Sequence, residues 1–225
     1  MFDAPKSKMK KRLIIPVFAI IIFKNGFSQN RSSAYDPCVA DTFDLLNNKP
    51  FARLLLEDTA GQIFNTSLLA GKTIYVDFWF TSCSPCLREI PYSKTLQQFF
   101  ASDTNIVFLN ICIDNIERKQ AWKQIINNKK MSGIHLFYMR NKPQKINLLK
   151  EYKITFPMHL LINKEMKIIG YDAPSPFEQG WVHWAIAEAE KNIFLSDSYR
   201  QLITHSKSYK EFIDDNLKII TSLTP

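Results

Sequence analysis

The sequence predicts an α/β fold in which helices flank a mixed central β-sheet. Segments rich in β-branched and aromatic residues, such as 73–80 and 105–114, alternate with segments whose apolar residues recur at helical spacing, such as 85–101. The extended segments 156–163 and 166–172 are separated only by a tight turn, which allows antiparallel but not parallel pairing. We therefore expect a sheet that contains both kinds of neighbouring strands.

The other elements follow from the same two periodicities. We predict extended segments at residues 51–58, 63–64, 73–80, 105–114, 134–139, 156–163 and 166–172. We predict helices at residues 38–46, 85–101, 117–130, 144–152, 177–193 and 197–222, with a kink at Pro91. The segment 73–80 is apolar at almost every position, as expected for a strand that is buried on both faces.

Size and charge limit the classes of function. The chain has 225 residues, of which 46% are hydrophobic, and this is enough for one well-buried core. The formal net charge is +8, but much of the excess lies in the first 28 residues. The rest of the chain has neither a Gly-rich basic tract nor a regular alternation of aromatic and basic residues. Nucleic-acid binding is therefore not expected.

The first 28 residues have the pattern of a secretory signal peptide. A basic stretch, 8–12, precedes an apolar run at 13–23, and the small residues Gly26 and Ser28 then precede Gln29. The run is well short of the roughly 20 apolar residues that a membrane-spanning helix needs. We predict cleavage near Gln29, no stable membrane insertion afterwards, and a location in the periplasm or cell envelope. An uncleaved anchor is the alternative.

Two cysteines lie at the expected junction between the strand 73–80 and the helix that follows. If this helix begins near Ser84, Cys83 faces the unpaired backbone N–H groups and the positive end of the helix dipole. Such a position lowers the pKa of a cysteine thiol, so Cys83 is predicted to attack as a thiolate. Cys86, one helical turn later, is expected to face inward, to be less exposed and to resolve the mixed disulfide.

An acidic residue, Asp77, interrupts the apolar strand six residues before Cys83. A buried carboxyl group must be paired or protonated and is costly otherwise, so a carboxyl group at this place indicates a functional role. We predict that Asp77 takes the proton from Cys86 when Cys86 attacks. The alternative is that strand alternation turns Asp77 toward solvent.

Taken together, these residues resemble a known family. The segment "VDFWFTSCSPC" resembles the active-site segment of thioredoxins, in which an acid, an aromatic pair and a Cys-x-x-Cys follow at the same spacing. Glu89 and Pro91, in "CLREIP", make it similar to the TlpA/ResA branch of secreted thioredoxin-fold reductases. The segments "LLLEDTAGQIF", Gly71-Lys72 and "TFPMHLLIN" match that branch in the same order. The resemblance covers roughly residues 50–192.

The resemblance implies an organisation for the whole chain. It implies a thioredoxin fold, a three-layer sandwich with an N-terminal β-hairpin, over residues 50–193. The predicted signal peptide 1–28 and an N-terminal extension, 29–49, come before this domain, and a C-terminal helical extension, 194–225, follows it.

The resemblance also assigns roles around the two cysteines. Pro157 matches a cis-proline that faces the redox disulfide, and Phe156 then exposes backbone groups that can pair with a substrate peptide. An ordinary trans proline at the start of a strand is the alternative. Ser84, Pro85 and Glu89 are expected to support the active site. Trp79 is expected either to line the substrate site or to be a core aromatic.

The function implied is thiol–disulfide exchange by an exported enzyme. The redox-active disulfide Cys83–Cys86 would serve in place of a cofactor, with no metal. Disulfide-containing exported proteins would be the substrates and a membrane thiol donor would supply electrons, with cytochrome c maturation or general redox homeostasis as the implied tasks. Ser82, Ser84 and the turn "NKEMK" depart from the family pattern, so the substrate, the redox potential and the direction of electron flow stay open.

Two other classes of function compete with this interpretation. A peroxiredoxin-like peroxidase is expected to have threonine or serine three residues before its reactive cysteine, where this chain has Phe80. A metal-binding or scaffold protein with a closed zinc site would need four ligands, and one Cys-x-x-Cys supplies two. Of the remaining cysteines, Cys112 is expected in the core, with a disulfide to Cys38 as the alternative.

Overall fold

The computed structural model describes residues 37–141 and 146–205. The predicted signal peptide, residues 29–36 of the predicted extension and the tail beyond residue 205 lie outside the described residues. The described helices are α2 (Pro37–Asp44), α3 (Ser84–Phe99), α4 (Lys119–Lys129), α5 (Leu148–Glu151), α6 (Trp181–Glu190) and α7 (Leu195–His205), with 3-10 turns η3 (Thr66–Leu69) and η4 (Ile116–Arg118). The strands are β1 (Leu55–Asp58), β2 (Ile63–Asn65), β3 (Thr73–Trp79), β4 (Ile106–Asp114), β5 (Ile134–Met139), β6 (Met158–Ile162) and β7 (Ile168–Tyr171).

The seven strands form one mixed sheet in the order β2-β1-β5-β4-β3-β6-β7. Strands β3, β4 and β5 are parallel neighbours, because α3 and α4 carry the chain back between them. Strand β6 is antiparallel to β3, and β7 is antiparallel to β6 across a short turn. The prediction of a mixed sheet in an α/β fold is therefore confirmed.

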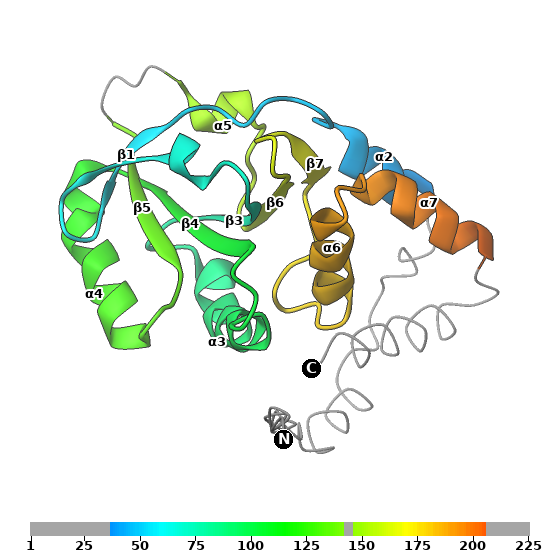
Figure 1. The fold of residues 1–225 in the computed structure, drawn as a ribbon. Coiled ribbons are helices and arrows are strands. Elements are labelled where there is room, and N and C mark those ends of the chain that lie inside the picture. Colours follow the sequence, from blue (N-terminus) through cyan, green and yellow to red (C-terminus); the bar gives the residue numbers. More distant parts are fainter. Residues whose placement is uncertain (1–36, 142–145, 206–225) are drawn as a thin grey trace, which may run out of the picture.

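Helices cover both faces of the sheet (Figure 1). Helices α3, α4 and α6 lie on one face, and α5 lies on the other with the chain that leads into β1. Strand β3 contributes to the core on both faces of the sheet. Ile74, Val76 and Phe78 point to one face, whereas Tyr75 and Trp79 point to the other. The three layers predicted for the chain are present, and β3 is buried on both faces as expected.

The two ends of the described chain meet beyond β7. Helices α2 and α7 lie side by side there (Figure 1). The ring of Tyr199 packs edge-on against Phe43, with 5.9 Å between centroids, and Arg200 forms ion pairs with Asp41 and Asp44 at 3.2 and 2.5 Å. In the part of the tail that the structure describes, α7 is thus a packing helix that pairs with α2.

Several predicted elements are shorter than the sequence indicated, including α5, β6 and β7, and two of the differences have a clear local cause. Strand β1 occupies only the second half of the predicted segment 51–58, because the backbone N–H of Phe51 donates to Met166 O and that of Leu54 donates to the Thr66 hydroxyl. Helix α6 begins later than residue 177, after Gly180, whose φ of 82° breaks the helical path. Helix α3 continues through Pro91. None of the described helices has both the length and the apolar character that a membrane-crossing helix requires.

Candidate active site

The two cysteines form a disulfide where β3 passes into α3. Their Cα atoms are 5.3 Å apart. Cys83 is the N-cap residue of α3, and its Sγ accepts a hydrogen bond of 3.2 Å from the backbone N–H of Cys86. Pro85, in the first turn of the helix, has no N–H to donate and fits that position without strain. The sulfur of Cys83 is therefore placed where backbone N–H groups stabilise a negative charge.

The expected difference in exposure between the two cysteines is wrong for the disulfide form. Cys83 is 3% exposed and Cys86 is 5% exposed, so Cys83 is no more accessible than its partner. Two aromatic rings that the local sequence does not place together, those of Phe80 and Phe156, pack against the cluster that contains both cysteines. The two rings meet edge-to-face with centroids 4.9 Å apart.

Removing one ring of this pair should make the two cysteine thiols of the reduced protein more accessible to reagents. We expect Phe80→Ala to raise the rate at which the reduced protein is alkylated, because half of the aromatic pair is lost. The cost in stability should be about 1–2 kcal/mol, below the 3–5 of a fully buried ring, since Phe80 is only half-buried. Phe99→Ala is the matched control, a half-buried ring at the far end of α3. Equal alkylation rates in both variants would contradict this role of Phe80.

The loop between Phe80 and Cys83 is fixed by a carboxylate at the end of β4. Asp114 Oδ2 accepts hydrogen bonds from the backbone N–H of Thr81 at 3.0 Å and from its hydroxyl at 2.6 Å. The Arg118 Nε donates to the Thr81 Oγ1 at 3.0 Å. Sequence reasoning did not identify these supports, because their partners are more than 30 residues apart along the chain. Thr81 is buried, so the loop that presents Cys83 is held firmly.

Asp77 is largely buried and lies beside two other titratable groups. Its side chain is 15% exposed, which excludes the alternative in which Asp77 points into solvent. The Nε2 of His159 is 3.5 Å from Asp77 Oδ1 and 3.4 Å from Glu89 Oε2. Burial raises the pKa of Asp77 from 3.8 to about 6, the positive charge of His159 opposes this rise, and Glu89 adds to it.

His159 is a buried residue that lies between the two carboxyl groups. The register of the sheet places it directly opposite Asp77, on the neighbouring strand β6. Burial by itself would lower the pKa of His159, but Glu89 and Asp77 raise it above its ordinary value. Glu89 Oε1 also accepts a hydrogen bond of 2.6 Å from the Ser175 hydroxyl.

The other predicted residues take their places around this group. The Phe156–Pro157 peptide bond is cis, as the resemblance implied. Trp79 is 2% exposed and packs in the cluster that contains Cys83, so it is a core aromatic that also adjoins the disulfide. Ser84 and Pro85 are exposed at the start of α3. The roles predicted for these residues in substrate binding stay predictions.

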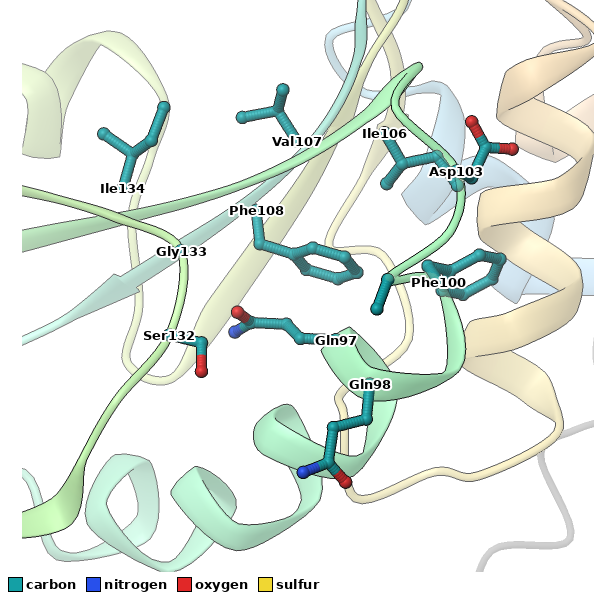
Figure 2. Close-up of a pocket in the computed structure, with 11 residues that line it drawn as sticks. Gln97, Gln98, Phe100, Asp103, Ile106, Val107, Phe108, Ser132, Gly133 and Ile134 are labelled. Atoms are coloured by element: carbon teal, nitrogen blue, oxygen red, sulfur yellow. The ribbon is translucent and has the colours of Figure 1, made fainter. Parts of the chain in front are cut away.

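The remaining titratable and polar features have no part in the disulfide; Cys112 belongs to the same buried cluster as Cys83 and Cys86. Cys112 is a buried free thiol, which excludes a disulfide with Cys38, and burial raises its pKa well above the ordinary value. Within residues 37–141 and 146–205, no three His, Cys, Asp or Glu side chains are grouped so that they could hold a metal ion. A pocket of about 400 Å³ lies at the C-terminal end of α3, away from the disulfide, and Gln97 and Phe108 are among the residues that line it (Figure 2).

Comparison with known proteins gives consistent matches. The family model described as Redoxin matches residues 40–178. The thiol-disulfide oxidoreductase ResA of Bacillus subtilis is 28% identical over 166 residues, which is 72% of this chain and 85% of ResA. A putative thiol-disulfide oxidoreductase from Bacteroides vulgatus has the same fold, with a TM-score of 0.55, 23% identity, and coverage of 65% of this chain and 98% of that one. A second solved structure from that organism has a TM-score of 0.50 and 28% identity, covering 56% and 80% of the two chains.

Proposed function

The chain belongs to the Redoxin family, and from this premise we propose that its Cys83–Cys86 pair reduces disulfide bonds in exported proteins. It is a thiol–disulfide oxidoreductase, similar to ResA. The observation that carries the proposal is the position of Cys83 at the N-cap of α3, where its sulfur accepts a hydrogen bond from the backbone N–H of Cys86. That placement favours a thiolate, and a thiolate is the attacking species in disulfide exchange.

The reaction follows from the roles of the two sulfurs. In the reduced enzyme, the Cys83 thiolate attacks one sulfur of a substrate disulfide, and the other substrate sulfur leaves as a thiolate that takes a proton from water. The Cys86 thiol then loses its proton to Asp77 and attacks Cys83. The Cys83–Cys86 bond forms, the second substrate thiolate leaves, and two electrons have passed to the substrate. A dithiol donor reduces the enzyme again.

Two features support a polypeptide as the substrate. The cis bond at Phe156–Pro157 precedes β6, so backbone groups of Phe156 lie where an extended peptide could pair with them. The ring of Phe156 meets that of Phe80 over the cysteine cluster, and this apolar cover suits the side chains that flank a buried or partly unfolded disulfide. Reduction of apocytochrome c before haem attachment and general redox homeostasis are the two tasks that we propose.

A redox titration with an insulin-reduction assay tests the direction of electron flow. For a reductase, we expect a potential nearer to about −270 mV than to about −120 mV, the two ends of the range in this fold. The reduced chain should then precipitate insulin by reducing its disulfides. If its task is cytochrome c maturation, it should reduce an oxidised apocytochrome c peptide faster than it reduces insulin. A potential near −120 mV with no insulin reduction would contradict the proposal.

Export is the second part of the proposal. The basic and apolar pattern of residues 8–23 supports it, together with the small residues before Gln29. Mass spectrometry of the protein from the cell envelope should find a mature N-terminus near Gln29. An intact Met1 in a protein that fractionates with the cytoplasm would contradict export while leaving the exchange chemistry untouched.

A further inference from the structure

We propose that His159 carries the proton of the exchange reaction from Asp77 to Glu89, and so acts on Cys86 through Asp77. This inference rests on the proposed function, because Asp77 receives that proton only if Cys86 attacks the mixed disulfide. The geometry carries it. A single nitrogen atom, His159 Nε2, lies 3.5 Å from Asp77 Oδ1 and 3.4 Å from Glu89 Oε2.

The three groups form one unit because the protonation state of each depends on that of the other two. Each of the atoms His159 Nε2, Asp77 Oδ1 and Glu89 Oε2 is buried and lacks a well-aligned hydrogen bond. One N–H cannot donate fully to two carboxylates, so a proton on this nitrogen is shared between them. Two carboxylates at such short range also repel each other, which favours a state with a proton among them.

The same nitrogen can take a proton from one side and release it to the other. When Asp77 has accepted the proton of Cys86, a neutral His159 Nε2 can remove it and restore the Asp77 carboxylate. The imidazolium then gives that proton to Glu89 Oε2, with no rotation of the ring. The Ser175 hydroxyl holds the other oxygen, Glu89 Oε1, at 2.6 Å, so the receiving carboxyl is fixed in place.

Both carboxyl groups reach the edge of the buried group, whereas the ring between them does not. The side chains of Asp77 and Glu89 are 15% and 12% exposed, and that of His159 is 3% exposed. Ser175 is half-buried in the loop before α6, so a proton on Glu89 is near the surface. Passing its proton to Glu89 therefore gives Asp77 a second route to solvent besides its own exposed fraction, and frees Asp77 for the next turnover.

The surroundings fix the ring and set its charge. Tyr75, on β3, stacks on the imidazole with 5.3 Å between ring centroids and an angle of 20° between their planes. The groups that face His159 are Asp77 and Tyr75 from β3, Glu89 from α3, and Asp172 after β7. All the charged ones are acidic. They raise the pKa of His159 above its ordinary value although its burial lowers it.

The reaction of the reduced protein with a chromophoric aromatic disulfide tests this proposal in two phases. Cys83 attacks first and releases one coloured thiolate. Cys86 then loses its proton, forms the bond to Cys83 and releases the second coloured thiolate. We expect His159→Phe, which keeps a ring against Tyr75, to leave the first phase unchanged. We expect it to slow the second phase roughly tenfold or more at neutral pH, but by no more than the roughly 10²–10⁴ that a general base contributes.

The pH profile separates a proton carrier from a structural residue. Without the positive charge of His159, Asp77 ionises at higher pH, so the midpoint of the second phase should rise by about one pH unit or more. His159→Gln restores a hydrogen-bond donor but cannot carry a proton, so it should restore thermal stability and leave the second phase slow. His135→Phe is the control, since His135 is also buried and its pKa is lowered by burial, against the effect of backbone groups of Met131 and Ser132.

A double-mutant cycle completes the test. Glu89→Gln should slow the second phase, and the double variant with His159→Phe should be no slower than the worse single variant, because one route is blocked twice. Three results would overturn the proposal: a second phase as fast as that of the wild type in His159→Phe, a fully restored rate of the second phase in His159→Gln, or additive losses of rate in the double variant. Loss of either phase in the wild-type protein would instead count against the proposed function. If His159→Phe does not fold, the rate and midpoint of the second phase in His159→Gln distinguish the same two outcomes.

Discussion

The Cys83→Ser variant is expected to lose disulfide reductase activity almost completely, by about 1000-fold or more in the insulin assay. The expectation follows from chemistry, because a serine hydroxyl does not ionise at neutral pH and cannot form the mixed disulfide. The hydrogen bond at the N-cap position survives, since serine caps helices well, so the fold should be retained. Circular dichroism and thermal unfolding would verify that retention.

The Cys86→Ser variant should behave differently from Cys83→Ser. It keeps the attacking sulfur and lacks the resolving one, so covalent complexes with substrate proteins should accumulate and disappear on addition of a reductant. Cys112→Ala is the control, because it removes the buried free thiol and leaves the pair intact. Full activity in Cys83→Ser, or trapped complexes in Cys83→Ser rather than Cys86→Ser, would reverse the roles given to the two sulfurs.

The Asp77→Asn variant is expected to exchange disulfides more slowly and yet to be more stable. An amide cannot take the proton of Cys86, so the rate of the resolving step should fall by roughly 10²–10⁴ at neutral pH. The same change removes a carboxyl group that is costly to bury in ionised form. Stopped-flow kinetics and denaturant unfolding of the oxidised protein would measure the two effects.

The sign of the stability change depends on pH. Because the pKa of Asp77 is raised from 3.8 to about 6 in the fold, the folded state holds this proton more tightly than the unfolded chain. Below pH 3.8 the carboxyl is protonated in both states and imposes no penalty. Between pH 3.8 and 6 the penalty grows, and above pH 6 it is complete, on the order of 3 kcal/mol.

The advantage of Asp77→Asn over the wild type should therefore appear near neutral pH and vanish in acid. Glu165→Gln is a suitable control, because its carboxyl group is exposed. Two results would contradict the burial of an ionised Asp77. One is an Asp77→Asn variant that is less stable than the wild type at pH 7, and the other is a stability advantage at pH 4 as large as that at pH 7.

The sequence predicted the features that depend on neighbours along the chain. The apolar run of β3, the period change after Cys83 and the two-residue gap to Cys86 are local signals, and together they located the disulfide, its helix and the N-cap position. The cis bond at Pro157 was implied by the family resemblance, since a proline at the start of a strand is equally compatible with a trans bond.

The features that sequence reasoning missed depend on tertiary contacts. Ser175 reaches Glu89 across 86 residues, and His159 meets Asp77 only because β6 pairs with β3 in one register. Likewise, Phe156 packs with Phe80 against the cluster that contains Cys83, although the two rings come from distant parts of the chain. The pairing register of strands was not derivable from the periodicity, which fixes the face of a residue but not its partner.

The most direct test of the account is the pH dependence of the alkylation rate of Cys83 in the reduced wild-type protein, with the modified cysteine identified by mass spectrometry. If backbone N–H groups at the start of α3 stabilise the thiolate, the rate should reach half its maximum well below about 8.5, the ordinary value for a cysteine thiol. A midpoint at or above that value, or a Cys83 that stays unmodified at every pH, would contradict it.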